Sequence, residues 1–212
     1  MKSSEFLDIL LAIFLFTIVI GVPSIINAQW SDLPKFFFFS ALLIFVVITS
    51  KKIVAYLLDS DVEHEIWKMS RFGLGEKHQL KKEIPAGIIF PLLFSIVTLG
   101  SFKLLTFLTY ESRALKVRAA KRFGFYSYTE MTDWHNGIIG TAGMLPLFAL
   151  AIIFYLINEE YLSAITSFYT FFNLLPFSKL DGTQIFFGSR VLWAILMLIS
   201  LIFSAYSLQF YI

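Results

Sequence analysis

Apolar residues occur in long runs that are separated by short polar segments. The first run covers about residues 6–26 and the second residues 36–58. Each is long enough for a helix that crosses the hydrocarbon core of a bilayer, which takes about 20 residues. Further apolar runs cover residues 85–108, 137–157, 161–177 and 191–212. The pattern predicts an all-α integral membrane protein with five or six membrane segments.

The two N-terminal runs need separate interpretation. The first is longer than the apolar stretch of a signal peptide, which spans about 7–15 residues, and Glu5 stands beside it. We therefore expect a retained span rather than a cleaved leader. The second run is interrupted by Lys51 and Lys52. Long basic side chains can keep an apolar stem in the membrane and extend the charge toward water, so we expect both lysines to reach an interface.

Two polar segments, residues 59–83 and 110–136, separate the central runs, and each carries five Lys and Arg residues. The first half of segment 59–83 has no helix breaker before Gly73, so it is expected to continue the preceding helix. Basic loops lie mainly on the cytoplasmic side of a membrane, which places both segments there. A single spanning helix between the two segments would place them on opposite sides of the membrane. Either residues 85–108 form a hairpin that enters and leaves by one face, which we favour, or one basic segment lies at the interface or inside the fold.

Composition agrees with the membrane class. Hydrophobic residues make up 58% of the 212 residues and charged residues 15%, whereas soluble domains have about 25% charged residues. The net charge of +2 is too small to indicate a nucleic-acid partner. Cysteine is absent from the sequence, so disulfides and thiolate metal sites are excluded. We expect a protein of the cell membrane whose partners are the bilayer and other membrane-spanning proteins.

The most informative polar residues lie within 173–182, in a part of the sequence that is apolar enough for a membrane segment. This stretch contains Asn173, a helix-breaking Pro176 and the pair Asp181–Gly182. A charged aspartate in hydrocarbon is costly, so it normally faces the protein interior, a water-filled cavity or a cation. Asp181 is therefore a candidate functional residue, although an Asp–Gly pair alone also suits a turn between two helices.

A second candidate is the sequence from His64 through Glu65 to Lys68. In an H-E-x-x-H zinc site two histidines on one helix face bind the metal, and the glutamate activates a water molecule. Here Lys68 stands at the second histidine position, and a protonated ammonium has no lone pair for a metal. Without further context, His64 and Glu65 are more often part of a solvated helix face.

The H-E-x-x element, followed downstream by N-x-x-P-x-x-x-x-D-G, resembles the site-two family of intramembrane zinc metalloproteases. The resemblance implies a zinc ion bound by two histidines and one aspartate, a catalytic glutamate, and cleavage of a membrane-spanning substrate within the bilayer. On this basis His64 and Asp181 are metal ligands and Glu65 is the catalytic base. His135 could replace the second histidine ligand, which is missing because Lys68 stands at its position. Its place beside Trp134 also suits a residue at a membrane interface.

The same resemblance assigns further positions and the domain plan. It implies that Gly182 accompanies the aspartate ligand, and that Asn173 and Pro176 shape the unwound region near the substrate. It covers residues 55–212, which would form a site-two-protease-like core, and leaves residues 1–54 as N-terminal spans of the same membrane domain, 1–212.

Three functional hypotheses follow. The first is an intramembrane zinc metalloendopeptidase. The second is a protein that keeps the protease fold without zinc and binds membrane helices, with the ammonium of Lys68 paired to Asp181 or Glu65. The third is a small transporter in which Lys68 and Asp181 line a polar path. The departure at Lys68 favours the second over the first, because a catalytic zinc generally keeps three protein ligands.

Overall fold

The computed structural model describes residues 3–71, 79–115 and 131–211 and is mostly helical. Four helices are long and apolar enough to cross a membrane: α1 (Ser3–Ile26), α2 (Leu33–Leu57), α5 (Asp133–Leu156) and α8 (Arg190–Tyr211). The shorter helices are η1 (Trp30–Asp32), α3 (Ala86–Val97), α6 (Glu160–Leu174) and α7 (Asp181–Gly188). By length and composition, the chain is therefore a candidate membrane protein with four spans in its described part.

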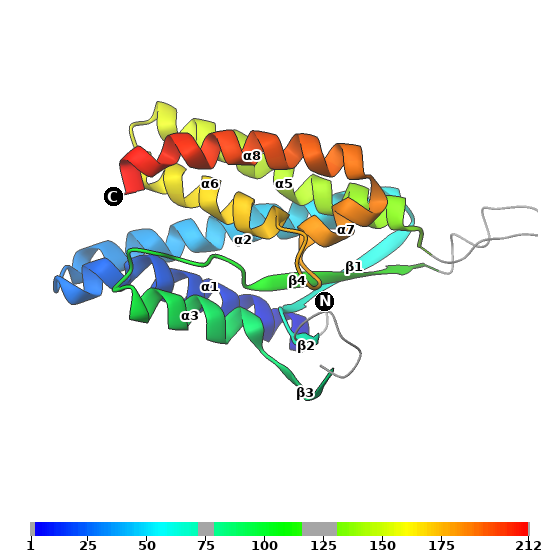
Figure 1. The fold of residues 1–212 in the computed structure, drawn as a ribbon, viewed down its shortest axis with the longest axis horizontal. Coiled ribbons are helices and arrows are strands. Elements are labelled where there is room, and N and C mark those ends of the chain that lie inside the picture. The colour runs from blue at the N-terminus through cyan, green and yellow to red at the C-terminus, as the bar shows by residue number, and fades with distance from the viewer. Residues whose placement is uncertain (1–2, 72–78, 116–130, 212) are drawn as a thin grey trace, which may run out of the picture.

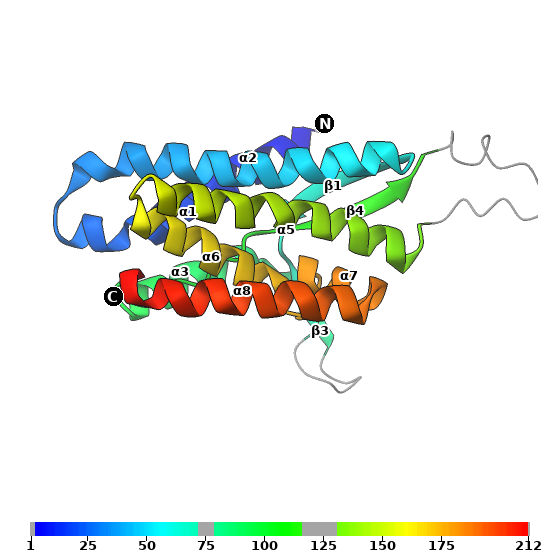
Figure 2. The same cartoon turned by 90° about the horizontal axis from the view of Figure 1, so that it is seen from above.

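The helices form one elongated bundle with two distinct ends (Figure 1). At one end, which we call the sheet end, α2 finishes and α1, α5 and α8 begin, beside α7 and the strands. At the other, which we call the turn end, lie the connections from α1 to α2 and from α5 to α6. Seen from above, α2 and α5 run side by side along the bundle (Figure 2).

Aromatic packing joins helices that are distant in the sequence. The fully buried ring of Phe16 in α1 lies 5.0 Å from that of Phe107 and 5.1 Å from that of Tyr169 in α6, measured between ring centroids. Aromatic pairs at such separations contribute stability beyond the burial of their area. This cluster fixes α1 and α6 against the extended chain between them.

The prediction of an all-α fold was wrong for the polar segments. β1 (Ser60–Ile66) pairs antiparallel with β4 (Leu108–Ala114), and β2 (Met69–Arg71) pairs antiparallel with β3 (Gln79–Ile84). The helix does not continue through this region, because α2 ends at Leu57 and Asp59 adopts a left-handed backbone conformation with φ 51°. Side chains of β1 alternate between buried and accessible, which is the period of a strand.

Side chains from two helices cap the outer edges of the β1–β4 ribbon. His64 of β1 lies opposite Tyr110 of β4. The backbone N–H of His64 donates to the carboxylate of Glu5 in α1, and the carbonyl of Tyr110 accepts from the amide of Gln184 in α7. In an antiparallel ladder, alternate opposed residues direct their backbone groups away from the partner strand, and here helix side chains satisfy two of them.

The third apolar run doubles back within the bundle, and its entry and exit by one face of a membrane stay a prediction. α3 starts beside the inner end of the β1–β4 ribbon and runs beside α1, where the hydroxyl of Ser95 donates to the carbonyl of Val19. The chain then reverses around Gly100, whose φ of 81° suits a residue without a side chain. It returns as extended chain to β4, and the amide of Asn173 donates to the carbonyl of Leu105 on the way. Residues 85–108 thus begin and finish close together, because the backbone of Trp67 accepts from Gly87 and donates to Phe107.

The expected count of five or six membrane segments stays a prediction. α3 has 12 residues and α6 has 15, both fewer than the roughly 17–25 residues that a spanning helix needs. α6 stops at Leu174 because Pro176 follows two residues later, and proline cannot continue a helix. The run expected over residues 161–177 is therefore a shorter helix packed against α5 and α8.

Candidate functional site

The predicted aspartate begins a helix next to a break in the chain. α6 ends at Leu174, an irregular segment carries the exposed Pro176, and α7 begins at Asp181. Gly182 is required by the close approach of these two helices, since a Cβ at this position would lie 2.0 Å from the carbonyl oxygen of Leu174. The Asp–Gly pair therefore places a buried carboxylate directly against the end of α6.

Asn173 secures the other side of this break. Its side chain is buried, and its amide donates to the carbonyls of Leu105, at 3.1 Å, and Tyr169, at 2.8 Å. A buried amide that satisfies backbone carbonyls in two segments fixes their relative position. Asn173 thus holds the end of α6 to the extended chain that leads to β4.

Asp181 forms a buried ion pair, but its partner is not the lysine named from the sequence. The Nζ atom of Lys51 in α2 lies 2.6 Å from Oδ2 of Asp181, and each side chain is 3% exposed. Lys51 was expected to reach an interface, and this was wrong, because the buried carboxylate draws its ammonium into the bundle. Lys68 instead lies at the surface, with Nζ 3.0 Å from the carboxylate of Glu65.

The side chain of Lys51 is enclosed by groups that suit a cation. Its Nζ lies 4.4 Å from the centroid of the Tyr110 ring, a distance at which an aromatic face attracts positive charge. The stem passes over Gly143 of α5, where a Cβ would come within 2.5 Å of its Cε. The hydroxyl of Tyr110 donates to the carbonyl of Asn136 at 2.6 Å. The ammonium of Lys51 is therefore enclosed by residues of α5, β4 and α7.

One carboxylate oxygen of Asp181 makes no hydrogen bond in the described structure. Oδ1 of Asp181 is buried and has no hydrogen-bond partner among the described residues. A buried carboxylate is strongly disfavoured unless it is paired, and here a single ammonium supplies most of the compensation. The pair is consequently an electrostatic link between α2 and α7 inside the bundle.

His64 lies in a separate polar cluster. It is buried on β1, and its Nδ1 atom lies 3.4 Å from Oε1 of Glu5, the same oxygen that lies 2.7 Å from Nζ of Lys52. Burial, followed by the positive charges of Lys51 and Lys52, holds the pKa of His64 well below its usual value. The imidazole is therefore neutral at pH 7, and Glu5 is balanced by Lys52.

The other predicted site residues lie in different surroundings. Glu65 faces away from the buried His64 along β1 and pairs with Lys68 on the surface. His135 is near the start of α5, where its ring and its backbone N–H contact the hydroxyl of the capping residue Thr132. The described segments contain no group of three or more His, Asp or Glu side chains placed to hold one metal ion. Asp181 is brought together with Lys51, and not with Glu65.

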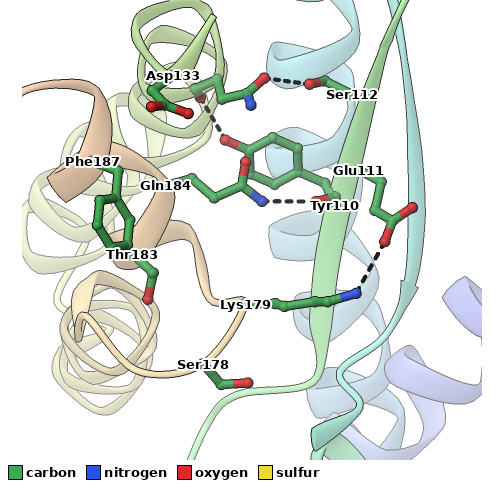
Figure 3. Close-up of a pocket in the computed structure, with 10 residues that line it drawn as sticks. Tyr110, Glu111, Ser112, Asp133, Ser178, Lys179, Thr183, Gln184 and Phe187 are labelled. Carbon is green, nitrogen blue, oxygen red and sulfur yellow. Dashed lines mark hydrogen bonds and ion pairs between the residues drawn. The ribbon is translucent and has the colours of Figure 1, made fainter. Parts of the chain in front are cut away.

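A polar cleft lies beside Tyr110 (Figure 3). It has a volume of about 530 Å³ and lies between β4, the start of α5, and α7. Gln184 and Asn136 line it and contact Tyr110, and the ammonium of Lys179 lies 3.1 Å from the carboxylate of Glu111 across its edge. Burial, followed by Asp181, raises the pKa of Tyr110 well above its usual value, so its hydroxyl stays protonated as a donor.

Sequence reasoning missed Lys51, Glu5 and Tyr110. A signal for the two charged residues was present, because both occur in or beside apolar runs long enough to cross a membrane. The argument that made Asp181 a candidate applies equally to them. Tyr110 had no comparable signal, since it is near the start of a polar segment and becomes buried only through strand pairing.

Comparison with known proteins adds no family assignment. The chain matches no family model, no curated protein and no solved structure.

Proposed function

We propose that this chain is a site-two-protease-like membrane protein that does not cleave, and that it acts by holding the membrane helix of a partner protein. The observation that carries the proposal is the 2.6 Å contact between Lys51 and Asp181, with both side chains 3% exposed. The carboxylate of Asp181, which the resemblance assigns to a metal, is already paired with the ammonium of Lys51. The ammonium supplies the charge compensation that zinc would otherwise bring.

The helix that faces Asp181 also lacks a ligand pair. Residues four apart on a helix share a face, and the residue four positions before Lys51 is the buried Val47. Neither an aliphatic side chain nor a protonated ammonium offers a lone pair to a metal. Among the described residues, this face of α2 thus supports a stable ion pair rather than a zinc site with two imidazoles.

A long apolar groove supports the binding of a helix. It has a volume of about 920 Å³ and lies between the outer faces of α1 and α2. Its lining on α2 extends from Phe38 to Leu57, which at 1.5 Å per residue is about 28 Å. This is close to the roughly 30 Å of a bilayer's hydrocarbon core. The length fits a spanning helix, and the small side chain of Ala41 leaves room for close packing.

Metal analysis tests the absence of a zinc site. We expect protein purified without chelators to contain far less than one zinc ion per chain, and the content to be the same in wild type and Asp181→Asn. Glu65→Gln serves as a surface control, because Glu65 is partly exposed and paired only with Lys68 in the described structure. Stoichiometric zinc that is lost on Asp181→Asn or His64→Ala would overturn this part of the proposal.

Photo-crosslinking in native membranes tests the partner helix. A photoreactive amino acid at Thr49, which lines the groove, is expected to give a discrete adduct with one membrane-spanning protein. The matched control is Leu198 of α8, which is 62% exposed outside the groove and is expected to label lipid only. Ala41→Trp fills the groove and should abolish the adduct. Equal labelling at both positions, or an adduct unaffected by Ala41→Trp, would contradict helix binding in the groove.

A further inference from the structure

The groove between α1 and α2 is mostly apolar, but Thr49 and Lys52 of α2 also line it. The two residues are three positions apart, so they are neighbours on one face of the helix. Lys52 is the one charged residue in the described lining, and its side chain is 32% exposed. Thr49 lies near the middle of the stretch of α2 that lines the groove, from Phe38 to Leu57. If α2 spans a bilayer, Thr49 is at the depth of the hydrocarbon core.

The hydroxyl of Thr49 differs from those of the threonines in α1, α5 and α6. Each of those hydroxyls donates to the backbone carbonyl four positions earlier in its own helix: Thr17, Thr141, Thr166 and Thr170. Within the described segments, Thr49 makes no side-chain hydrogen bond, and it is half-buried in the groove wall. A hydroxyl in hydrocarbon is disfavoured unless it is paired. The donor and the acceptor of Thr49 are therefore available to an occupant of the groove.

Lys52 adds hydrogen-bond donors without adding net charge. Its Nζ atom lies 2.7 Å from Oε1 of the buried Glu5, whose carboxylate balances the ammonium. An ammonium has three N–H donors, and Glu5 is the one acceptor of Lys52 in the described structure. Donors and an acceptor thus lie close together on the groove wall, and the balanced charge favours a neutral ligand over a carboxylate.

We infer that the partner's membrane helix carries a neutral amide side chain, of asparagine or glutamine, that binds Thr49 and Lys52 at the middle of the groove. This inference rests on the proposed function, because it assumes a helix in the groove. An amide oxygen has two lone pairs for the hydroxyl and the ammonium, and the amide N–H can donate to the hydroxyl. Such hydrogen bonds join helices in membranes. They add to the apolar contact, so a photoreactive residue at Thr49 still reports occupancy.

Crosslinking to model helices tests this ligand class. The protein, with a photoreactive phenylalanine analogue at Phe45, is reconstituted in phosphatidylcholine vesicles with a synthetic leucine–alanine helix of about 20 residues. Phe45 lines the groove and is 68% exposed. A helix with one central asparagine is expected to give about three- to tenfold more adduct than the same helix with leucine there. Asparagine moved to one end of the helix should give no gain, because Thr49 is near the middle of the groove.

Two threonine variants assign the effect. Thr49→Val removes a hydroxyl without a partner in the described structure, so the fold is retained and the preference for asparagine should disappear. Thr17→Val removes a hydroxyl bonded within α1, outside the groove, and should keep the preference. Equal adducts with the asparagine and leucine helices would overturn the inference and leave helix binding standing. The same holds if the preference survives in Thr49→Val, or if central aspartate gives more adduct than asparagine. Absence of every adduct would overturn helix binding and the inference with it.

Discussion

Lys51→Met is expected to lower the free energy of unfolding by about 3–5 kcal/mol, the usual effect of removing one partner of a buried ion pair. Methionine matches much of the lysine stem in length, so the packing against Gly143 is retained. The loss comes from the carboxylate of Asp181, which is left buried without its partner at 2.6 Å. Thermal or denaturant unfolding of the purified protein in detergent measures the change.

A matched substitution and a double variant separate charge from packing. Lys68→Met removes a lysine whose side chain is 45% exposed and which pairs with Glu65, so it should change stability by only about 0–1 kcal/mol. Combining Lys51→Met with Asp181→Asn should recover most of the loss, because no unpaired charge remains buried. If Lys51→Met were as stable as Lys68→Met, the buried pair would not exist in the folded protein.

Gly182→Ala is expected to have the second large effect, a destabilisation at or above the usual range of about 1–3 kcal/mol for overpacking. The added Cβ would lie 2.0 Å from the carbonyl oxygen of Leu174 and 2.7 Å from that of Leu175. Both are backbone atoms, so the end of α6 or the start of α7 must move. Unfolding in detergent and the yield of folded protein report the effect.

Gly21→Ala provides the control for this substitution. The new Cβ at Gly21 would lie 2.8 Å from Cδ2 of Leu33, the end of a side chain that can rotate away. Both glycines are in helices, so the gain in helix propensity, about 1 kcal/mol, is similar at the two positions. A variant at Gly182 no less stable than that at Gly21 would show that the helices do not approach as closely as described.

Sequence patterns predicted the long apolar helices and the need of Asp181 for charge compensation, for physical reasons that are local. Long apolar runs report the length of a bilayer, and a carboxylate inside such sequence needs compensation wherever the chain places it. The doubling back of residues 85–108 was the favoured of two expectations, because a single span cannot place two basic segments on the same side of a membrane. These inferences need no knowledge of which residues meet in space.

The identity of the partner cation was not predictable in the same way. The H-E-x-x match directed attention to Lys68, whereas the contact is made by Lys51, 17 positions earlier on α2. The error began with the strand, because residues 60–66 were expected to be helical. Alternation in Ser60–Ile66 is a signal of a strand, but the lack of a helix breaker before Gly73 was given more weight. Which lysine meets Asp181 depends on long-range packing around Gly143 and Tyr110.

The separation of Lys51 and Asp181 along the chain has a consequence for biogenesis. The two residues are 130 positions apart, so α2 leaves the ribosome long before α7 is made. Until then the ammonium of Lys51, six residues before the end of α2, lacks its carboxylate, and an unpaired lysine within a spanning helix disfavours insertion of that helix. Nascent and finished chains thus differ in the stability of α2 in the bilayer, and completion of the last third of the protein secures a span inserted at the beginning.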